Sequence, residues 1–136
     1  MNTEHDNEPQ MNLEQRIEAI ESGYEFLLAY AAQGRDSDRG AGQGRNVREF
    51  LEKMETALGG LGAVVRADAE QRDAELPNTC AAFFDAVSGD AETAQAAIRL
   101  VLAQQDISSQ LVDNLNANIH LRALLTDLFV VDEAFK

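Results

Sequence analysis

Apolar residues recur in alternating steps of three and four along most of the chain, which is the spacing of one face of an α-helix. The first such run begins at Leu13, with Asn12 in the position of an N-cap and Gly34 as its expected end. Its apolar positions are Leu13, Ile17, Ile20, Tyr24, Leu27 and Ala31. The run predicts an amphipathic helix that packs nearly parallel to a neighbour.

A second run predicts another long helix beyond residue 46. Its apolar positions are Val47, Phe50, Leu51, Met54, Leu58, Leu61 and Val65. The register continues through Gly59, Gly60 and Gly62, which favours one continuous helix that another backbone approaches closely at the glycines. A break into two shorter helices is the alternative. After Val65 the chain is charged on all sides, so we expect the helix to extend past the core as far as Leu76.

Two shorter helices are expected next. Asn78 or Thr79 is a candidate N-cap for the first of them, and Ser88-Gly89 is its expected end. Asp90 is then the expected N-cap of the second. A helix-turn-helix reader of DNA is disfavoured, because several carboxylates surround the start of this second helix and would meet phosphate.

The densest apolar segment lies at the end of the chain. Asp106, Ser108 and Ser109 are start signals for a last helix that reaches Val131 or Phe135. Residues 121 to 131 are apolar around most of the helix circumference, which indicates a central position or a contact between two copies. We therefore expect that the chain can form a homodimer.

These elements predict an all-α fold, an up-and-down antiparallel bundle of four to five helices with a flexible Gly/Arg loop between the first two. Residues 13 to 136 form one predicted domain. Residues 1 to 12 are polar, acidic and without apolar periodicity, so a disordered tail is expected there. The pattern leaves open whether Met1 or Met11 is the start. No apolar run approaches the length of a membrane span.

Charge narrows the classes of partner. The 136 residues carry a formal net charge of −13, which repels nucleic-acid backbones and anionic lipid surfaces. The single cysteine, Cys80, cannot form an internal disulfide, and no secretory signal pattern is present, so a cytoplasmic location is expected. Neither a nucleic acid nor a membrane is an expected partner.

The segment from Gly34 to Arg48 is the exception to the acidic average. It carries four of the eleven basic residues and several glycines. It matches neither GxxxxGK[ST] nor GxGxxG, and no strand precedes it, so a nucleotide-binding loop is not expected. A mobile arm that offers arginine forks to a carboxylate or phosphate of a protein partner is the functional hypothesis, and a solvated connector is the alternative. The candidate contact residues are Arg35, Arg39, Arg45 and Arg48.

Metal and nucleophilic chemistry have weaker support. A carboxylate-bridged metal pair in a helical bundle uses Glu-x-x-His, whereas the residue three before His120 is Ala117, so no metal and no cofactor are predicted. Cys80 lies near an expected helix N-terminus, but a small buried residue is the better interpretation. His120 is seven residues from both Asp113 and Asp127 and could share a helix face with them.

Two classes of function follow, with a third behind them. The first is a non-enzymatic accessory or adaptor protein that acts through protein-protein interaction, with residues 34 to 48 as the candidate contact. The second is a small-ligand-binding or enzymatic bundle with a pocket between helices. Its polar groups would be Tyr24, Tyr30, Cys80 and His120. The third is an acidic mimic of nucleic acid that binds a basic protein.

Overall fold

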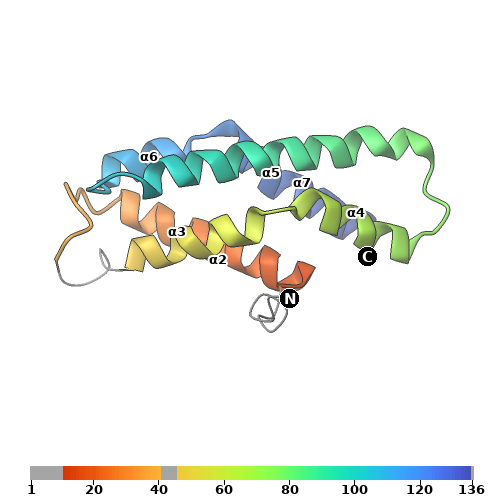
Figure 1. The fold of residues 1–136 in the computed structure, drawn as a ribbon, viewed down its shortest axis with the longest axis horizontal. Helices are drawn as coiled ribbons and strands as arrows, with labels where there is room; N and C mark the ends of the chain where they lie inside the picture. Colours follow the sequence, from red (N-terminus) through yellow and green to blue (C-terminus); the bar gives the residue numbers. More distant parts are fainter. Residues whose placement is uncertain (1–10, 41–45, 136) are drawn as a thin grey trace, which may run out of the picture.

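The computed structural model describes residues 11–40 and 46–135, and all the regular structure in these residues is helical (Figure 1). The described residues form six α-helices. They are α2 (Leu13–Ala31), α3 (Val47–Leu58), α4 (Leu61–Arg72), α5 (Ala81–Leu102), α6 (Ser109–Asn116) and α7 (Ile119–Ala134), with a 3₁₀ turn, η2 (Asn78–Cys80), before α5. The all-α prediction is confirmed.

The helices lie along one long axis (Figure 1). α3 and α4 follow each other from one end of the molecule to the other, α5 returns along the whole length, and α6 and α7 follow each other back. α2 covers only part of this length: it packs mainly on α3 and α6 and has few contacts with α4. The part of the molecule that holds α4 and α7 therefore has one helix fewer around its core.

One continuous apolar core joins all six helices. Its largest fully buried side chains come from α2, α3, α4, α5, α7 and the turn before α6, and α6 adds the buried Val112. They include Ile20, Leu27, Leu51, Met54, Leu61, Ile98, Ile107, Leu121 and Leu124. Gly23 of α2 allows α3 to approach, because a Cβ atom there would lie 2.5 Å from Met54 Cγ. The helical register read from the sequence is thus the register that the core uses.

The expectation of one continuous helix through the glycines is wrong, because the helix breaks at Gly59 and Gly60. Gly60 has φ +68°, a left-handed conformation that residues other than glycine rarely adopt. The freed carbonyls of Ala57 and Gly59 accept hydrogen bonds from Arg16 Nη1 of α2, at 3.0 and 2.6 Å. α4 continues the line of α3, which explains why the apolar register runs through the break.

The close approach expected at these glycines does occur. A Cβ atom on Gly62 would lie 2.7 Å from Ser88 Cα, so α4 and α5 touch backbone to backbone at this point. α4 then ends at Arg72, and the chain does not remain helical as far as Leu76. Arg72 Nη1 donates to Phe135 O at 3.0 Å, which ties the end of α4 to the end of α7.

The two short helices expected after residue 78 are one helix, so the break at Ser88-Gly89 was predicted wrongly. α5 runs through both residues, and Asp90 lies inside it. Its buried positions keep one helical register across the glycine: Phe84, Val87, Ala91, Ala94, Ile98 and Val101. Burial of this face outweighs the roughly 1 kcal/mol that a glycine costs in a helix interior.

The expected last helix is in fact two helices. Ser108 caps α6, as its start signal predicted, because its side chain accepts from Leu111 N at 3.0 Å. The helix then stops at Asn116, and Asn118 caps α7 by accepting from His120 N and Leu121 N. The expectation of one uninterrupted helix from residue 109 to residue 131 is therefore wrong.

The beginning of the folded part is capped as predicted. The Asn12 side chain accepts from Gln15 N, and the Gln15 side chain accepts from Asn12 N, which together form a capping box. Met11 packs against the core, so Met11 and Asn12, expected in the tail, belong to the folded part. The rest of the expected tail, residues 1–10, lies outside the described residues. Within the described residues, no helix is both long and apolar enough to cross a membrane.

Candidate functional site

The described part of the Gly34 to Arg48 segment is fastened to the turn between α5 and α6. Arg35 N donates to Ser109 Oγ at 2.9 Å, and Ser109 N donates to Arg35 O at 2.8 Å. Ser109 Oγ in turn donates to Tyr30 O at 2.7 Å. Ser37 Oγ donates to Asp106 Oδ1 at 2.7 Å. These bonds join the end of α2 to the start of α6.

Asp38 is the centre of this connection and is 8% exposed. It accepts from Arg48 Nε at 2.7 Å and from Ile107 N at 2.9 Å. Burial raises the pKa of its carboxyl, but hydrogen bonds from Arg48 and from the backbone N–H groups of Ile107 and Asp38 outweigh burial and lower it. Asp38 is therefore an ionised structural carboxylate.

Arg48 uses the rest of its guanidinium to cap α5. Nη1 donates to Leu102 O at 3.1 Å, and Nη2 donates to Gln104 O at 2.8 Å and to Gln105 O at 3.1 Å. A cation at this position also complements the negative end of the helix dipole. Arg48 thus makes intramolecular contacts with all three nitrogens, a role that the sequence did not suggest.

The other arginines of the predicted contact differ in their surroundings. Arg35 donates to Ser37 O at 3.1 Å and to Arg39 O at 3.0 Å, within its own loop. Arg39 is 63% exposed and forms an ion pair of 3.3 Å with the half-exposed Asp106. Arg45 lies outside the described residues. Among the described arginines of this set, Arg39 is the one whose side chain is mostly exposed to solvent.

The four residues proposed for a ligand pocket are not brought together. Tyr30 is fully buried near the end of α2, and its hydroxyl donates to Ile107 O at 2.7 Å. Cys80 lies at the opposite end of the molecule, just before α5 (Figure 1). Tyr24 lies within α2, and His120 begins α7. Two surface concavities of the described chain are lined by other residues, and none of these four belongs to either.

His120 instead contacts a carboxylate pair between α5 and α7. Its Nδ1 atom is 3.0 Å from Asp90 Oδ1, and Asp113, which we expected on the same helix face, belongs to α6. Burial, together with the neighbouring Asp90, raises the pKa of Asp127 to about 6. The Oδ2 atom of Asp127 is buried and accepts no hydrogen bond from the described residues. Among those residues, no three His, Cys, Asp or Glu side chains are arranged to hold a metal ion.

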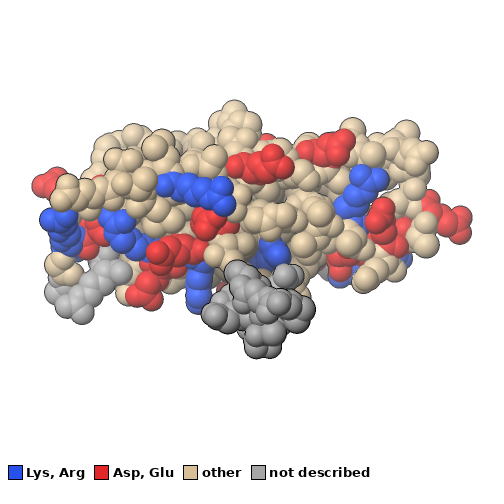
Figure 2. Space-filling model, in the orientation of Figure 1, with Lys and Arg blue, Asp and Glu red and all other residues tan. Residues whose placement is uncertain are grey.

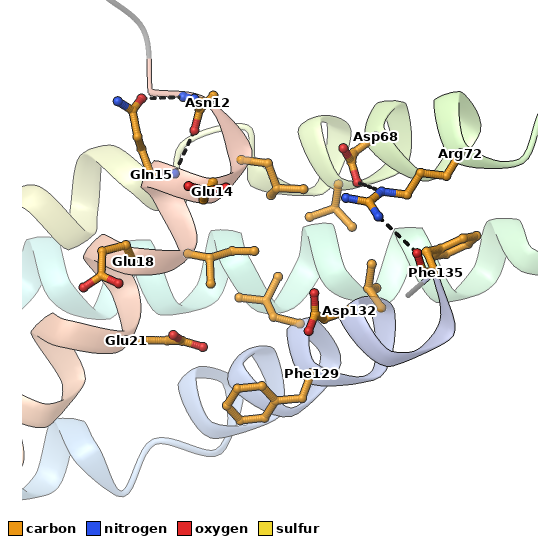
Figure 3. A pocket seen from close by; sticks show the side chains of 15 residues that line it. Asn12, Glu14, Gln15, Glu18, Glu21, Asp68, Arg72, Phe129, Asp132 and Phe135 are labelled. Atoms are coloured by element: carbon orange, nitrogen blue, oxygen red, sulfur yellow. Dashed lines mark hydrogen bonds and ion pairs between the residues drawn. The ribbon is translucent and has the colours of Figure 1, made fainter.

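A groove of about 730 Å³ lies between the first turns of α2, residues 65–72 of α4 and the last turns of α7 (Figure 3). α4 and α7 both pack on α5 but make at most marginal contact with each other. Apolar side chains from all three helices line the groove, and Phe129 at its edge is 58% exposed. The apolar residues that line the groove are Leu13, Ile17, Val65, Leu128, Phe129, Val131 and Phe135.

Carboxylates surround these apolar side chains. They are Glu14, Glu18, Glu21, Asp68 and Asp132, against one cation, Arg72. Arg72 pairs with Asp68 at 2.8 Å, and no described cation pairs with the other four. Partial burial raises the pKa of Glu21, and the charges of Glu18, Asp132 and Glu25 raise it further. Figure 3 shows Glu21 directed into the groove.

The sequence did not reveal this groove, although it contained two signals. In the sequence, the spacing of Glu14, Glu18 and Glu21 predicts the solvated flank of one helix. In the structure they do lie on that flank of α2. Phe129 and Val130 are apolar but lie outside the buried register of α7, which uses Leu121, Leu124, Leu128 and Val131. Only the tertiary arrangement brings the acidic flank of α2 beside this exposed apolar edge.

Comparisons with known proteins add no assignment, since no family model, no curated protein and no solved structure matches the chain.

Proposed function

We propose that this protein is a non-enzymatic adaptor, an up-and-down helical bundle that acts by binding another protein. The observation that carries the proposal is the open groove between α2, α4 and α7, with its apolar lining and unpaired carboxylates. Surfaces that combine exposed apolar side chains with a polar rim are typical of protein-protein contacts. A cytoplasmic location and a homodimer remain parts of this proposal.

The Gly34 to Arg48 segment is a second candidate contact, in a narrower form than the sequence suggested. Arg48 holds the fold together, so its loss would damage the protein itself. The side chain of Arg35 donates only to carbonyls of its own loop. Arg39, together with Arg45, is the part of the set that remains to be tested as a contact.

A ligand-binding or enzymatic function has weaker support. The contact of His120 with Asp90, and the raised pKa of Asp127, would suit proton transfer, but neither described concavity reaches these residues. A nucleic-acid mimic also has weaker support. Figure 2 shows acidic and basic side chains interspersed on the face that carries α3, α4 and α5, rather than a continuous acidic stripe.

Affinity purification of the full chain, followed by mass spectrometry, tests the proposal. We expect a partner in stoichiometric amount. The double variant Arg39→Ala/Arg45→Ala and the single variant Phe129→Ser then assign the contact to the loop or to the groove. Arg39 and Phe129 are exposed, and both variants should leave helical circular dichroism unchanged. Recovery of the chain without any stoichiometric partner, at native expression level, would refute an adaptor function.

A further inference from the structure

We infer that the groove between α2, α4 and α7 binds an amphipathic helix with basic flanks, supplied by a partner protein. This inference rests on the proposed adaptor function and specifies the chemistry of the partner. Its starting point is the fold itself: α4 and α7 lie on either side of α5 without closing on each other, beside the N-terminus of a helix that covers only part of the bundle.

The apolar lining indicates a helix as the occupant. Val65, Leu128 and Val131 are buried at the base of the groove, while Phe129 stands at the edge with more than half of its side chain in water. A helix laid between α4 and α7 would cover Phe129 with its own apolar stripe, as neighbouring helices of a bundle do. The groove is thus bounded by helices and open to a further one.

Charge selects the kind of helix. Glu14, Glu18, Glu21 and Asp132 line the groove without a described cation in ion-pair contact, and Arg72 is already paired with Asp68 and bound to Phe135 O. Lysine or arginine beside the apolar stripe of a partner helix would neutralise these carboxylates. The crowding of Glu21 by Glu18 and Asp132, which raises its pKa, would be relieved at the same time.

The same charges argue against two other occupants. A second copy of this chain would bring another net charge of −13 to an acidic groove. Residues 1–10, MNTEHDNEPQ, include three carboxylates and no lysine or arginine, and they lack an apolar stripe. A basic partner helix is therefore the occupant that the lining fits.

Two synthetic peptides of about 14 residues, roughly four helical turns, test the inference. Both carry the same leucine stripe, and the flanking positions are lysine in one and glutamate in the other. We expect the lysine peptide to bind the full chain at least about tenfold more tightly than the glutamate peptide in calorimetric titration, with weaker binding as salt is raised. Nuclear magnetic resonance should show the strongest shifts at Phe129 and Phe135.

Matched variants separate the groove from the general acidic field. Glu18→Gln/Glu21→Gln/Asp132→Asn should weaken the lysine peptide at least about tenfold. Glu52→Gln/Asp85→Asn/Glu92→Gln removes the same charge from exposed positions outside the groove and should change binding less than about twofold. Phe129→Ser should weaken binding, whereas Leu100→Ser, at another exposed apolar position, should not.

Several results would overturn the inference. Equal losses in the two triple variants would mean charge attraction without a site, and equal binding of both peptides, or of neither, would remove the charge argument. Self-association that Phe129→Ser abolishes would assign the groove to a second copy. Nuclear Overhauser contacts of the Phe129 ring with residues 1–10 would assign it to the chain's own N-terminus. When one of these results is obtained and a natural partner is nevertheless captured through Arg39 and Arg45, the inference about the groove fails but the adaptor function stands.

Discussion

The substitution Asp127→Asn should make the protein more stable at neutral pH, although it removes a charged residue from a well-ordered helix. Asp127 shares the space between α5 and α7 with Asp90, and its Oδ2 atom is buried without a hydrogen-bond partner among the described residues. Burial, a hydrogen bond shared with Asp90 and the Asp90 charge all disfavour the ionised carboxylate, which raises its pKa from 3.8 to about 6. An asparagine amide carries no charge and could donate to Asp90.

The direction and size of the stability change in Asp127→Asn follow from proton linkage. Below about pH 4 the carboxyl is protonated in both the folded and the unfolded chain, and its contribution to stability is complete. As pH rises, the unfolded chain releases its proton first, so the free energy of unfolding falls until the pH passes about 6. At 1.36 kcal/mol per pH unit, the pKa difference sets an upper limit of about 3 kcal/mol. Because the carboxyl is only partly withdrawn from water, we expect about 1–2 kcal/mol.

Urea unfolding followed by circular dichroism, from about pH 4 to pH 7, measures this effect. The Asp127→Asn chain should exceed the wild type in unfolding free energy at pH 7 and match it near pH 4. The exposed Asp113→Asn serves as control and should change stability by less than about 0.5 kcal/mol at either pH. A gain that does not vary with pH, or a loss at pH 7, would refute the reasoning.

Two further predictions concern the loop and the glycines. Arg48→Ala should lower the unfolding free energy by about 3–5 kcal/mol, because it leaves the buried Asp38 without its ion-pair partner. The control Arg39→Ala, at an exposed position, should lower it by less than about 1 kcal/mol. Similar urea midpoints for the two variants would contradict the structural role of Arg48. Gly60→Ala should destabilise the protein by about 1–2 kcal/mol, because residue 60 has a positive φ. Gly89→Ala, inside α5 with open space around it, should stabilise the protein by about 0.5–1 kcal/mol. Thermal unfolding that shows stability changes of the same sign in both variants would disprove this account.

The two glycine positions show where the sequence pattern could and could not locate helix ends. The apolar register runs through both Gly59-Gly60 and Ser88-Gly89, yet the chain breaks at the first and continues at the second. At the first break, Arg16 donates hydrogen bonds to the freed carbonyls. At the second, Ser88 lies against Gly62 of α4, so the small residues serve packing between helices. Three of residues 59–62 are glycine but only one of residues 88–91 is, and the neighbour in space also differs.

The sequence by itself determined most of the residues that face the core, because helical periodicity and the burial of apolar surface depend on local spacing. Ile119 and Phe129, which the pattern also placed on the apolar face of the last helix, are exposed. The sequence also determined the caps at Asn12 and Ser108, which act within their own first helical turns. Only the tertiary structure decided where Arg48 and Asp38 meet, and that α2 leaves a groove beside α4 and α7. These features join residues that are distant in the chain, so no local pattern can encode them. The proposed partner-binding groove is accordingly a surface that three separate helices build together.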